Sequence, residues 1–317
     1  MPVLALLLAT AQAPICAPAA AAIDAAAART VAQGGAGLVV AVARDGRPLF
    51  RRGYGRADLE HRAPVTPDTV FRLASITKQF TAAAVLRLVE QGRLRLEDPV
   101  AKHLPGFPGG ERTTLRHLLT HTSGVPDHSE DPSGVPTKAL AKTGDEMLAW
   151  IARLAVRPAF APSEKWAYSN SNYVLLGLVV ERAAGRPLAQ VFVDELFRPA
   201  GLTRTAFDEP GDLVPNRARG YRKTKAGVVN ADAIHWTMPG AAGGLRSTAD
   251  DLVRWSDALF GGRVLRPESL ALMTEPGRLA DGRTTRWGMP DAWRIGMDAD
   301  YALGVFVTAT PRGPRVW

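Results

Sequence analysis

The chain has 317 residues, 46% of them hydrophobic and 22% charged, and this balance predicts a globular protein of about two domains, or of one domain with a large insertion. The net charge is +8, but the basic residues, mostly Arg, are scattered without a dense run, so we expect no nucleic-acid partner. The single cysteine, Cys16, excludes an internal disulfide and a thiolate metal cluster.

The N-terminal stretch resembles a secretory signal peptide. Residues 2–11 form a short apolar block, and Ala11-Gln12-Ala13 follows as a small-x-small cleavage site. We expect residues 1–20 to be removed from a secreted or periplasmic protein. Because the start lacks Lys and Arg, an Ala-rich N-terminal helix is the alternative. No later apolar run reaches the ~18 residues of a membrane helix, so we expect no membrane span.

The next segment predicts a helix and a hairpin. Residues 23–33 are predicted to be helical, because Gly34-Gly35 then ends the apolar pattern. Two apolar runs, residues 37–43 and 48–53, flank Asp45-Gly46, and Asp-Gly between such runs is a strong hairpin signal.

The stretch at residues 71–80 carries a serine three positions before a lysine. The apolar run 80–89 that follows ends at Gly92 and predicts a buried helix. Positions three apart share a helix face, so Ser75 and Lys78 are expected to meet. The alternative is an N-cap serine beside a solvated lysine, but a cation in the first turn opposes the helix dipole. We expect burial to lower the pKa of Lys78 towards the ~7–8 that suits a general base.

Three histidines lie in or just after the short helix predicted at residues 114–121. His117 and His121 are four positions apart, and His128 follows, so a metal site is conceivable. No HExxH glutamate or fourth ligand is evident, and we expect no metal. Packing at the helix end and in the loop is the preferred interpretation.

The triplet Lys142-Thr143-Gly144 precedes an apolar-periodic helix. Thr143 and Glu146 have the spacing of a capping box, so we predict a helix start there and no catalytic role.

A second polar element, Tyr168-Ser169-Asn170, leads into a helix predicted at residues 173–184. A phenol beside a Ser/Lys pair can shuttle a proton if a nearby cation lowers its pKa from ~10. The Asn side chain can donate to a substrate carbonyl or to the polar network around the lysine. The alternative is that Ser169 or Asn170 is only the N-cap of the helix.

The remaining elements are weaker signals. Residues 200–246 and 274–300 are predicted to be irregular or loop-like. Three further helices and two strands are expected between and after them: 187–196, 249–260 and 267–273 for the helices, and 301–309 and a strand beginning at 315.

Taken together, Ser75-x-x-Lys78 and Tyr168-x-Asn170 resemble the first two motifs of the penicillin-recognising serine hydrolases. The Tyr form is similar to the branch of class C β-lactamases, D-alanyl-D-alanine carboxypeptidases and family VIII esterases. The resemblance runs from about residue 25 to the end of the chain. Ser163 is a departure, because a Gly after Pro162 is usual. Further stretches carry the likeness: 118–124, 168–181, 243–252 and 301–304.

The resemblance implies an α+β fold of the β-lactamase/transpeptidase type, an antiparallel sheet flanked by helices with a large, mostly helical insertion. Residues 21–74 and 291–317 are expected to form the sheet-containing region, and residues 75–290 the helical region that carries the site motifs. In the family, a strand bearing Lys-Thr-Gly or His-x-Gly follows a segment like 301–317, and further strands and a closing helix come after it. We therefore expect this chain to be a fragment of a longer protein.

The resemblance also implies acyl transfer without a metal or organic cofactor. Ser75 would attack an amide or ester carbonyl after Lys78 and Tyr168 remove its proton, Asn170 would contact the substrate, and the Ser75 N–H would stabilise the oxyanion. The pattern does not choose among β-lactams, D-amino-acid peptides and small esters. The alternative is a catalytically inactive binding or structural relic of the same fold, because the third motif is absent.

Overall fold

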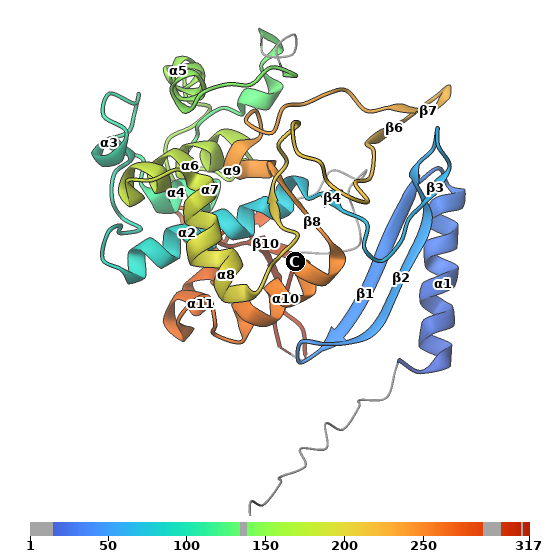
Figure 1. Ribbon diagram of the computed structural model, residues 1–317. Helices are drawn as coiled ribbons and strands as arrows, with labels where there is room; N and C mark the ends of the chain where they lie inside the picture. The colour runs from blue at the N-terminus through green and yellow to red at the C-terminus, as the bar shows by residue number, and fades with distance from the viewer. Residues whose placement is uncertain (1–14, 134–137, 288–298, 312) are drawn as a thin grey trace, which may run out of the picture. The chain divides into compact units, whose positions relative to one another are not determined.

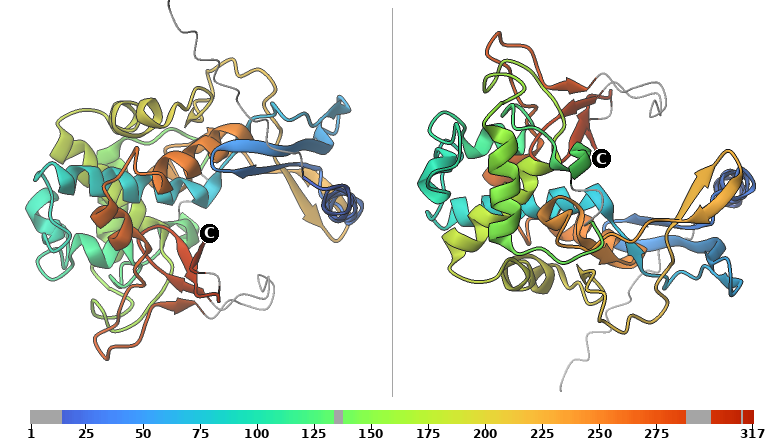
Figure 2. Two further views of the ribbon diagram at one scale, coloured as in Figure 1. Left: turned by 90° about the horizontal axis from the view of Figure 1, so that it is seen from below. Right: turned by 90° about the horizontal axis from the view of Figure 1, so that it is seen from above.

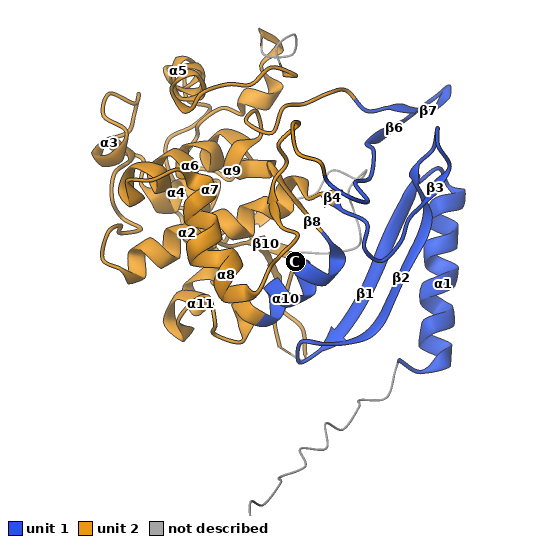
Figure 3. Cartoon of the chain, viewed as in Figure 1, with its two compact units in different colours: residues 1–70, 214–231, 248–257 blue, residues 71–213, 232–247, 258–317 orange. Residues whose placement is uncertain are grey.

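The computed structural model describes residues 15–133, 138–287, 299–311 and 313–317. The chain divides into two compact units (Figure 3): residues 1–70, 214–231 and 248–257 in one, and residues 71–213, 232–247 and 258–317 in the other. The apolar block and the cleavage site predicted in residues 2–13 lie outside the described residues. No helix in the described ranges has the length and hydropathy needed to cross a bilayer.

The first unit is built on the predicted hairpin, which is confirmed. Strands β1 (Gly37–Arg44) and β2 (Arg47–Asp58) pair antiparallel, with Asp45 and Gly46 at positive φ in a two-residue turn. The unit also contains a helix, a short third strand, a second hairpin and most of a further helix: α1 (Ala17–Ala32), β3 (Ala63–Pro64), β6 (Tyr221–Thr224), β7 (Gly227–Asn230) and α10 (Ala249–Phe260).

The second unit holds most of the helices (Figure 1). Its longer helices are α2 (Thr77–Glu90), α5 (Gly144–Ala155), α6 (Asn170–Ala184) and α11 (Pro267–Thr274). The shorter ones are α3 (Val100–His103), α4 (Leu115–Leu119), α7 (Leu188–Phe192), α8 (Arg198–Ala200) and α9 (Gly240–Gly243), with 3₁₀ turns η1 (Ala74–Ile76) and η2 (His128–Glu130) and a π-helical turn η4 (Val193–Phe197).

Helix α2 lies at the centre of this unit, as its apolar sequence predicted. Its residues 82–86 have no exposed surface, nor do Phe80 and Leu88. Full burial of a Phe, Val or Leu side chain contributes ~1.5–3 kcal/mol, so this helix is a rigid support for whatever its first turn carries. The helix ends before Gly92, whose φ of 71° is easy only for glycine.

A short sheet holds the chain that enters α2. Strand β8 (Leu245–Ser247) lies between β4 (Phe71–Arg72) and β5 (Ala206–Phe207), and the Leu73 N–H donates to the Leu245 carbonyl at 2.8 Å. The prediction that residues 200–246 are irregular was wrong here, because these two- and three-residue strands are too short to show a period in the sequence.

The C-terminal residues form four short antiparallel strands in the order β12-β11-β10-β9, shown in red beside the helices of the same unit in Figure 2. They are β9 (Arg286–Trp287), β10 (Ala299–Tyr301), β11 (Phe306–Thr308) and β12 (Arg315–Val316). The prediction of one strand over 301–309 was wrong. Gly304 turns the chain at φ 78°, and a Cβ there would lie 2.7 Å from the Lys78 carbonyl oxygen. Only glycine therefore fits where this turn meets α2.

The helices and antiparallel sheets confirm the predicted α+β class. The hairpin and the C-terminal strands were expected in one sheet, but in the described residues β1 pairs only with β2, and β9 to β12 pair among themselves. The compact units group the C-terminal strands with the helices. The predicted division into residues 21–74 with 291–317, and 75–290, stays a prediction.

Candidate active site

Ser75 lies in η1, directly before α2, and its side chain is exposed. The residue before it, Ala74, has a φ of 46°, a left-handed conformation that disfavours any residue with a Cβ. Strain of this kind persists only where the surroundings impose it, and it occurs often at active sites. Here the pairing of β4 with β8 on one side and the buried α2 on the other hold the chain in this turn.

Lys78 is buried one turn after Ser75, with 1% of its surface exposed. Its Nζ lies 3.2 Å from Ser75 Oγ, so the predicted meeting of the two side chains is confirmed. Nζ also donates to Asn170 Oδ1 at 2.8 Å and to the Ala242 carbonyl at 2.9 Å. Burial lowers the pKa of Lys78 to about 7, and the charge of Asp127 opposes that shift only in part.

This environment suits a neutral amine. A neutral Nζ has two N–H groups, and the oxygens of Asn170 and Ala242 accept both. The remaining lone pair then faces the Ser75 hydroxyl. With a pKa of about 7, a large fraction of Lys78 is neutral at neutral pH and is able to accept a proton.

Tyr168 donates its phenolic hydrogen to Ser75 Oγ at 2.7 Å, and Lys78 Nζ lies 4.6 Å from the centre of its ring. The condition stated for a proton shuttle, a pKa lowered by a nearby cation, is not met. Burial raises the pKa of Tyr168 to about 12, and this outweighs the hydrogen bond to Ser75. A lysine that is itself largely neutral also provides little charge to stabilise a phenolate. Tyr168 is thus a proton donor in the resting site.

Asn170 is the first residue of α6, and its amide is held at both ends. Its Oδ1 accepts from Lys78, and its Nδ2 donates to Asp127 Oδ2 at 3.0 Å and to Ser129 Oγ at 3.2 Å. The alternative that Ser169 or Asn170 is only an N-cap was wrong, since Ser169 has the cap position but its side chain makes no capping hydrogen bond. The amide of Asn170 instead links the lysine to a carboxylate.

Two residues of this network were not predicted as site residues. The first is Asp127, whose charge raises the pKa of both Lys78 and Tyr168. No local pattern marks Asp127 as a site residue, because a lone Asp in a Pro-rich loop is a common turn residue.

The second is His121, which has no exposed surface and lies beyond the end of α4 at a φ of 58°. Its ring centroid is 4.4 Å from that of Tyr168, and its Nδ1 accepts from the Ser169 N–H at 3.2 Å. Burial holds its pKa well below the usual range, so a neutral ring packs against the phenol.

The other histidines have packing roles, as preferred from the sequence. His117 completes a capping box with Thr114 at the start of α4. His128 is buried, and its Nε2 lies 3.0 Å from the Met238 carbonyl. Across the described ranges, no group of three or more His, Cys, Asp or Glu side chains is arranged to hold a metal ion.

The Lys142-Thr143-Gly144 triplet starts α5, as predicted. Thr143 Oγ1 accepts from the Glu146 N–H, and the Glu146 carboxylate accepts from the Thr143 N–H, which is a complete capping box. This triplet is structural.

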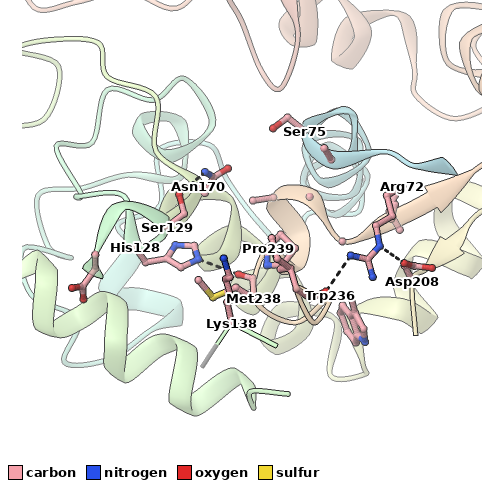
Figure 4. A pocket seen from close by; sticks show the side chains of 17 residues that line it. Arg72, Ser75, His128, Ser129, Lys138, Asn170, Asp208, Trp236, Met238 and Pro239 are labelled. Carbon is pink, nitrogen blue, oxygen red and sulfur yellow. Dashed lines mark hydrogen bonds and ion pairs between the residues drawn. The ribbon is translucent and has the colours of Figure 1, made fainter. Parts of the chain in front are cut away.

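A cavity of about 440 Å³ opens beside Ser75 and Asn170. In the view of Figure 4, Ser75 lies between Asn170 and His128 on one side and Arg72 and Asp208 on the other. A carbonyl compound in this cavity would meet the Ser75 hydroxyl, which itself lies within hydrogen-bond distance of Lys78 and Tyr168.

Comparisons with known proteins identify relatives of this chain. The family model described as Beta-lactamase matches residues 22–317. A penicillin-binding protein of Bacillus subtilis (strain 168) is 30% identical over 267 residues, covering 78% of this chain and 58% of the relative. Esterase EstB of Burkholderia gladioli is 35% identical over 288 residues, covering 80% of this chain and 73% of the esterase. This chain thus spans 58% of the Bacillus relative's length.

Solved structures give the same result. The D-amino acid amidase from Ochrobactrum anthropi SV3, in its complex with L-phenylalanine amide, has a TM-score of 0.78 at 26% identity over 94% of this chain and 83% of the amidase. A D-stereospecific amidohydrolase from Streptomyces sp. has a TM-score of 0.72 at 30% identity over 92% of this chain and 84% of that protein. The fold predicted from the two motifs is confirmed.

Proposed function

The chain belongs to the beta-lactamase family, and from this premise we propose that it is a serine hydrolase that forms an acyl-enzyme on Ser75 with an amide or ester substrate. The observation that supports the proposal most strongly is the contact of Ser75 Oγ with a buried amine whose pKa is about 7 and with a phenol that donates to it. The relatives named for ester and amide hydrolysis are consistent with either substrate class.

In the first step, neutral Lys78 takes the proton of Ser75, and Oγ bonds to the substrate carbonyl carbon as the carbonyl π electrons move to oxygen. The lysine becomes an ammonium, matched by three acceptors within 3.2 Å. The backbone N–H of Ser75, at the start of a helix, faces the developing oxyanion.

In the second step, the bond to the leaving group breaks, and the phenol of Tyr168 protonates the departing nitrogen or oxygen. Lys78 then returns a proton to the phenolate, so the net transfer is from Ser75 to the leaving group. Water then gives a proton to the same amine and attacks the carbonyl carbon of the ester on Ser75. The bond between that carbon and Oγ breaks, the Lys78 ammonium returns the proton to Oγ, and the acid is released. This chemistry uses Lys78 as the base and Tyr168 as the acid, which follows from the opposite directions of their pKa shifts.

We also propose that the protein acts outside the cytoplasm, as the signal-like N-terminal sequence suggests. Export in a bacterial host, followed by N-terminal sequencing of the mature protein, tests this separately from catalysis. A mature N-terminus within residues 12–23 supports export, and a cytoplasmic protein that keeps Met1 refutes it.

The hydrolase proposal is tested by covalent labelling. The protein is treated with a fluorophosphonate and, separately, with a fluorescent penicillin, and the labelled peptide is identified by mass spectrometry. Label on Ser75 that is lost in Ser75→Ala and kept in Ser163→Ala supports the proposal. A folded protein that takes up neither reagent at Ser75 contradicts it and favours a non-catalytic role.

A further inference from the structure

The cavity beside Ser75 extends away from the nucleophile towards Arg72 and Trp236 (Figure 4). Its volume of about 440 Å³ is enough for a substituent well beyond an acetyl group. What this space accepts depends on whether its charged side chains are available and on the character of its remaining surface.

The charged groups on the cavity wall are engaged with protein partners. Arg72 Nε donates to Asp208 Oδ2 at 2.5 Å, and its Nη1 donates to the Ile234 carbonyl at 3.1 Å. Lys138 Nζ pairs with Asp232 at 2.7 Å. A substrate carboxylate would therefore compete with a carboxylate that is already bound to each of these cations.

The acids on the wall are engaged too. Asp131 Oδ2 accepts from the Trp150 indole and from Arg153, both at 2.7 Å. The hydrogen bond from Trp150 and those from Ser133 hold the pKa of Asp131 well below the usual range. Asp208 has 2% of its surface exposed and lies within 3.6 Å of Arg246 as well as against Arg72. A substrate ammonium thus finds no carboxylate on this wall without a cation already beside it.

The rest of the lining is apolar. The indole N–H of Trp236 donates to Glu209, so the carbon face of the ring is left for the cavity. Ile234 is 39% exposed and also lines the cavity, and Met238 is a further apolar lining residue with 8% of its surface exposed. Small residues at 242–244 leave the space next to the nucleophile open.

We propose that this cavity is an acyl-binding subsite that selects uncharged, apolar acyl groups, so that the preferred substrates are esters or amides of medium-chain or aromatic acids. This inference rests on the proposed function, because it assigns the acyl side of the same Ser75 reaction. Each methylene buried in such a cavity is expected to raise kcat/KM by roughly three- to fourfold until the cavity is full.

The test uses p-nitrophenyl esters, which share one leaving group. Acetate, butyrate, hexanoate and octanoate vary the chain length. Two matched pairs vary the charge: butyrate against hemisuccinate, which adds a carboxylate, and propionate against D-alanine ester, which adds an ammonium. Each kcat/KM is divided by the rate of spontaneous hydrolysis of the same ester. We expect hexanoate to exceed acetate by at least tenfold, and each neutral ester to exceed its charged partner by at least tenfold.

A cavity-filling variant locates the effect. Ile234→Trp adds an indole at the cavity wall while keeping the backbone carbonyl that accepts from Arg72. Leu213→Trp adds the same group at a side chain that is 99% exposed and outside the cavity lining, and so is the matched control. We expect Ile234→Trp to lower the hexanoate-to-acetate ratio by about tenfold and Leu213→Trp to leave it unchanged.

The outcomes separate the two proposals. Three results would overturn the acyl subsite and leave the serine hydrolase proposal intact. They are hydrolysis of acetate with no dependence on chain length, a preference for either charged ester, and an unchanged hexanoate-to-acetate ratio in Ile234→Trp. If no ester is hydrolysed and Ser75 takes no fluorophosphonate, the proposed function fails and the inference fails with it.

Discussion

Ser75 and Ser163 each lie within hydrogen-bond distance of a basic side chain, but only one of the two bases is able to accept a proton from its serine. Ser75 is 3.2 Å from Lys78 Nζ, and Ser163 is 2.9 Å from His117 Nε2. The His117 Nδ1 accepts from the Thr114 N–H, so in the neutral ring Nε2 carries the hydrogen and donates to Ser163. That imidazole is unable to take a proton from the serine.

At Ser75 the constraint is reversed. Two carbonyl oxygens accept the N–H groups of a neutral Lys78, and the lone pair is directed at the hydroxyl. Proximity is similar in the two pairs, and the hydrogen bonds around the base decide which serine is activated. A motif search that looks only for a serine near a base would score both alike.

The largest difference is expected on removing the two hydroxyls. Ser75→Ala should lower kcat/KM by at least ~10³-fold, because the acyl-enzyme is no longer formed. Ser163→Ala loses one neutral hydrogen bond and should keep kcat/KM within about twofold. Ester hydrolysis by the two purified variants, with circular dichroism to verify folding, measures this. Equal losses in both would remove the distinction between the sites.

Replacing the base should have nearly as large an effect. Lys78→Arg keeps a cation, but a guanidinium stays protonated at all accessible pH, so kcat should fall by about 10³-fold. In the wild type, kcat/KM should rise with pH through about 7 and level off above it, because only neutral Lys78 accepts the proton. Retained activity in Lys78→Arg, or a rate that falls as pH rises from 6 to 8, would contradict this role.

Tyr168→Phe should lower kcat/KM by about 10²–10³-fold, since the ring still stacks on His121 while the proton donor is lost. The loss should be smaller for p-nitrophenyl esters than for anilides, because p-nitrophenolate leaves without protonation. Comparing the two leaving groups on one acyl chain measures this. The same loss for both would indicate that Tyr168 acts before the leaving group departs.

Much of this arrangement could be predicted from the sequence. A Ser and a Lys three positions apart at the start of a buried helix predicted their contact, and the Asp45-Gly46 turn predicted the first hairpin. These features are local, so a short stretch of sequence contains their cause.

Long-range features were missed or wrong. The high pKa of Tyr168 comes from burial by distant elements, and β4 pairs with β8 across more than a hundred residues. Gly304 divides a predicted strand because it meets Lys78, which lies far away in the sequence. Tertiary packing sets these properties, and no local pattern encodes them.

Asp127→Asn should have a moderate effect. The Asp127 charge raises the pKa of Lys78, so its removal should lower that pKa and shift the rising limb of kcat/KM to lower pH. The new side-chain amide presents one oxygen and one NH2 group, so it accepts from Asn170 Nδ2 in only one of its two orientations. We therefore expect the plateau value of kcat/KM to fall by up to about tenfold. Glu130→Gln, which removes an exposed charge three residues away, is the control. A rising limb of kcat/KM that moves to higher pH in Asp127→Asn would contradict this role of the Asp127 charge.

The smallest effect concerns stability at the other serine. Ser163 has a φ of 63°, a left-handed conformation that favours Gly. Ser163→Gly and Ser163→Ala both lose the bond to His117, but only Gly relieves the left-handed strain, so Gly should be the more stable by about 0.5–1 kcal/mol. Urea unfolding of the two variants measures the difference. A less stable Gly variant would show that the strain is negligible.

The central claim is that Lys78 is a neutral base at the pH where the enzyme acts. The chain has seven lysines, so a ¹³C-labelled lysine titration followed by NMR can resolve them, with Lys78→Arg to assign the signal. We expect one lysine to titrate near pH 7 and this signal to be missing in the variant. If every lysine, Lys78 included, titrates at ~10 or above, as unperturbed side chains do, the proposed activation of Ser75 is contradicted.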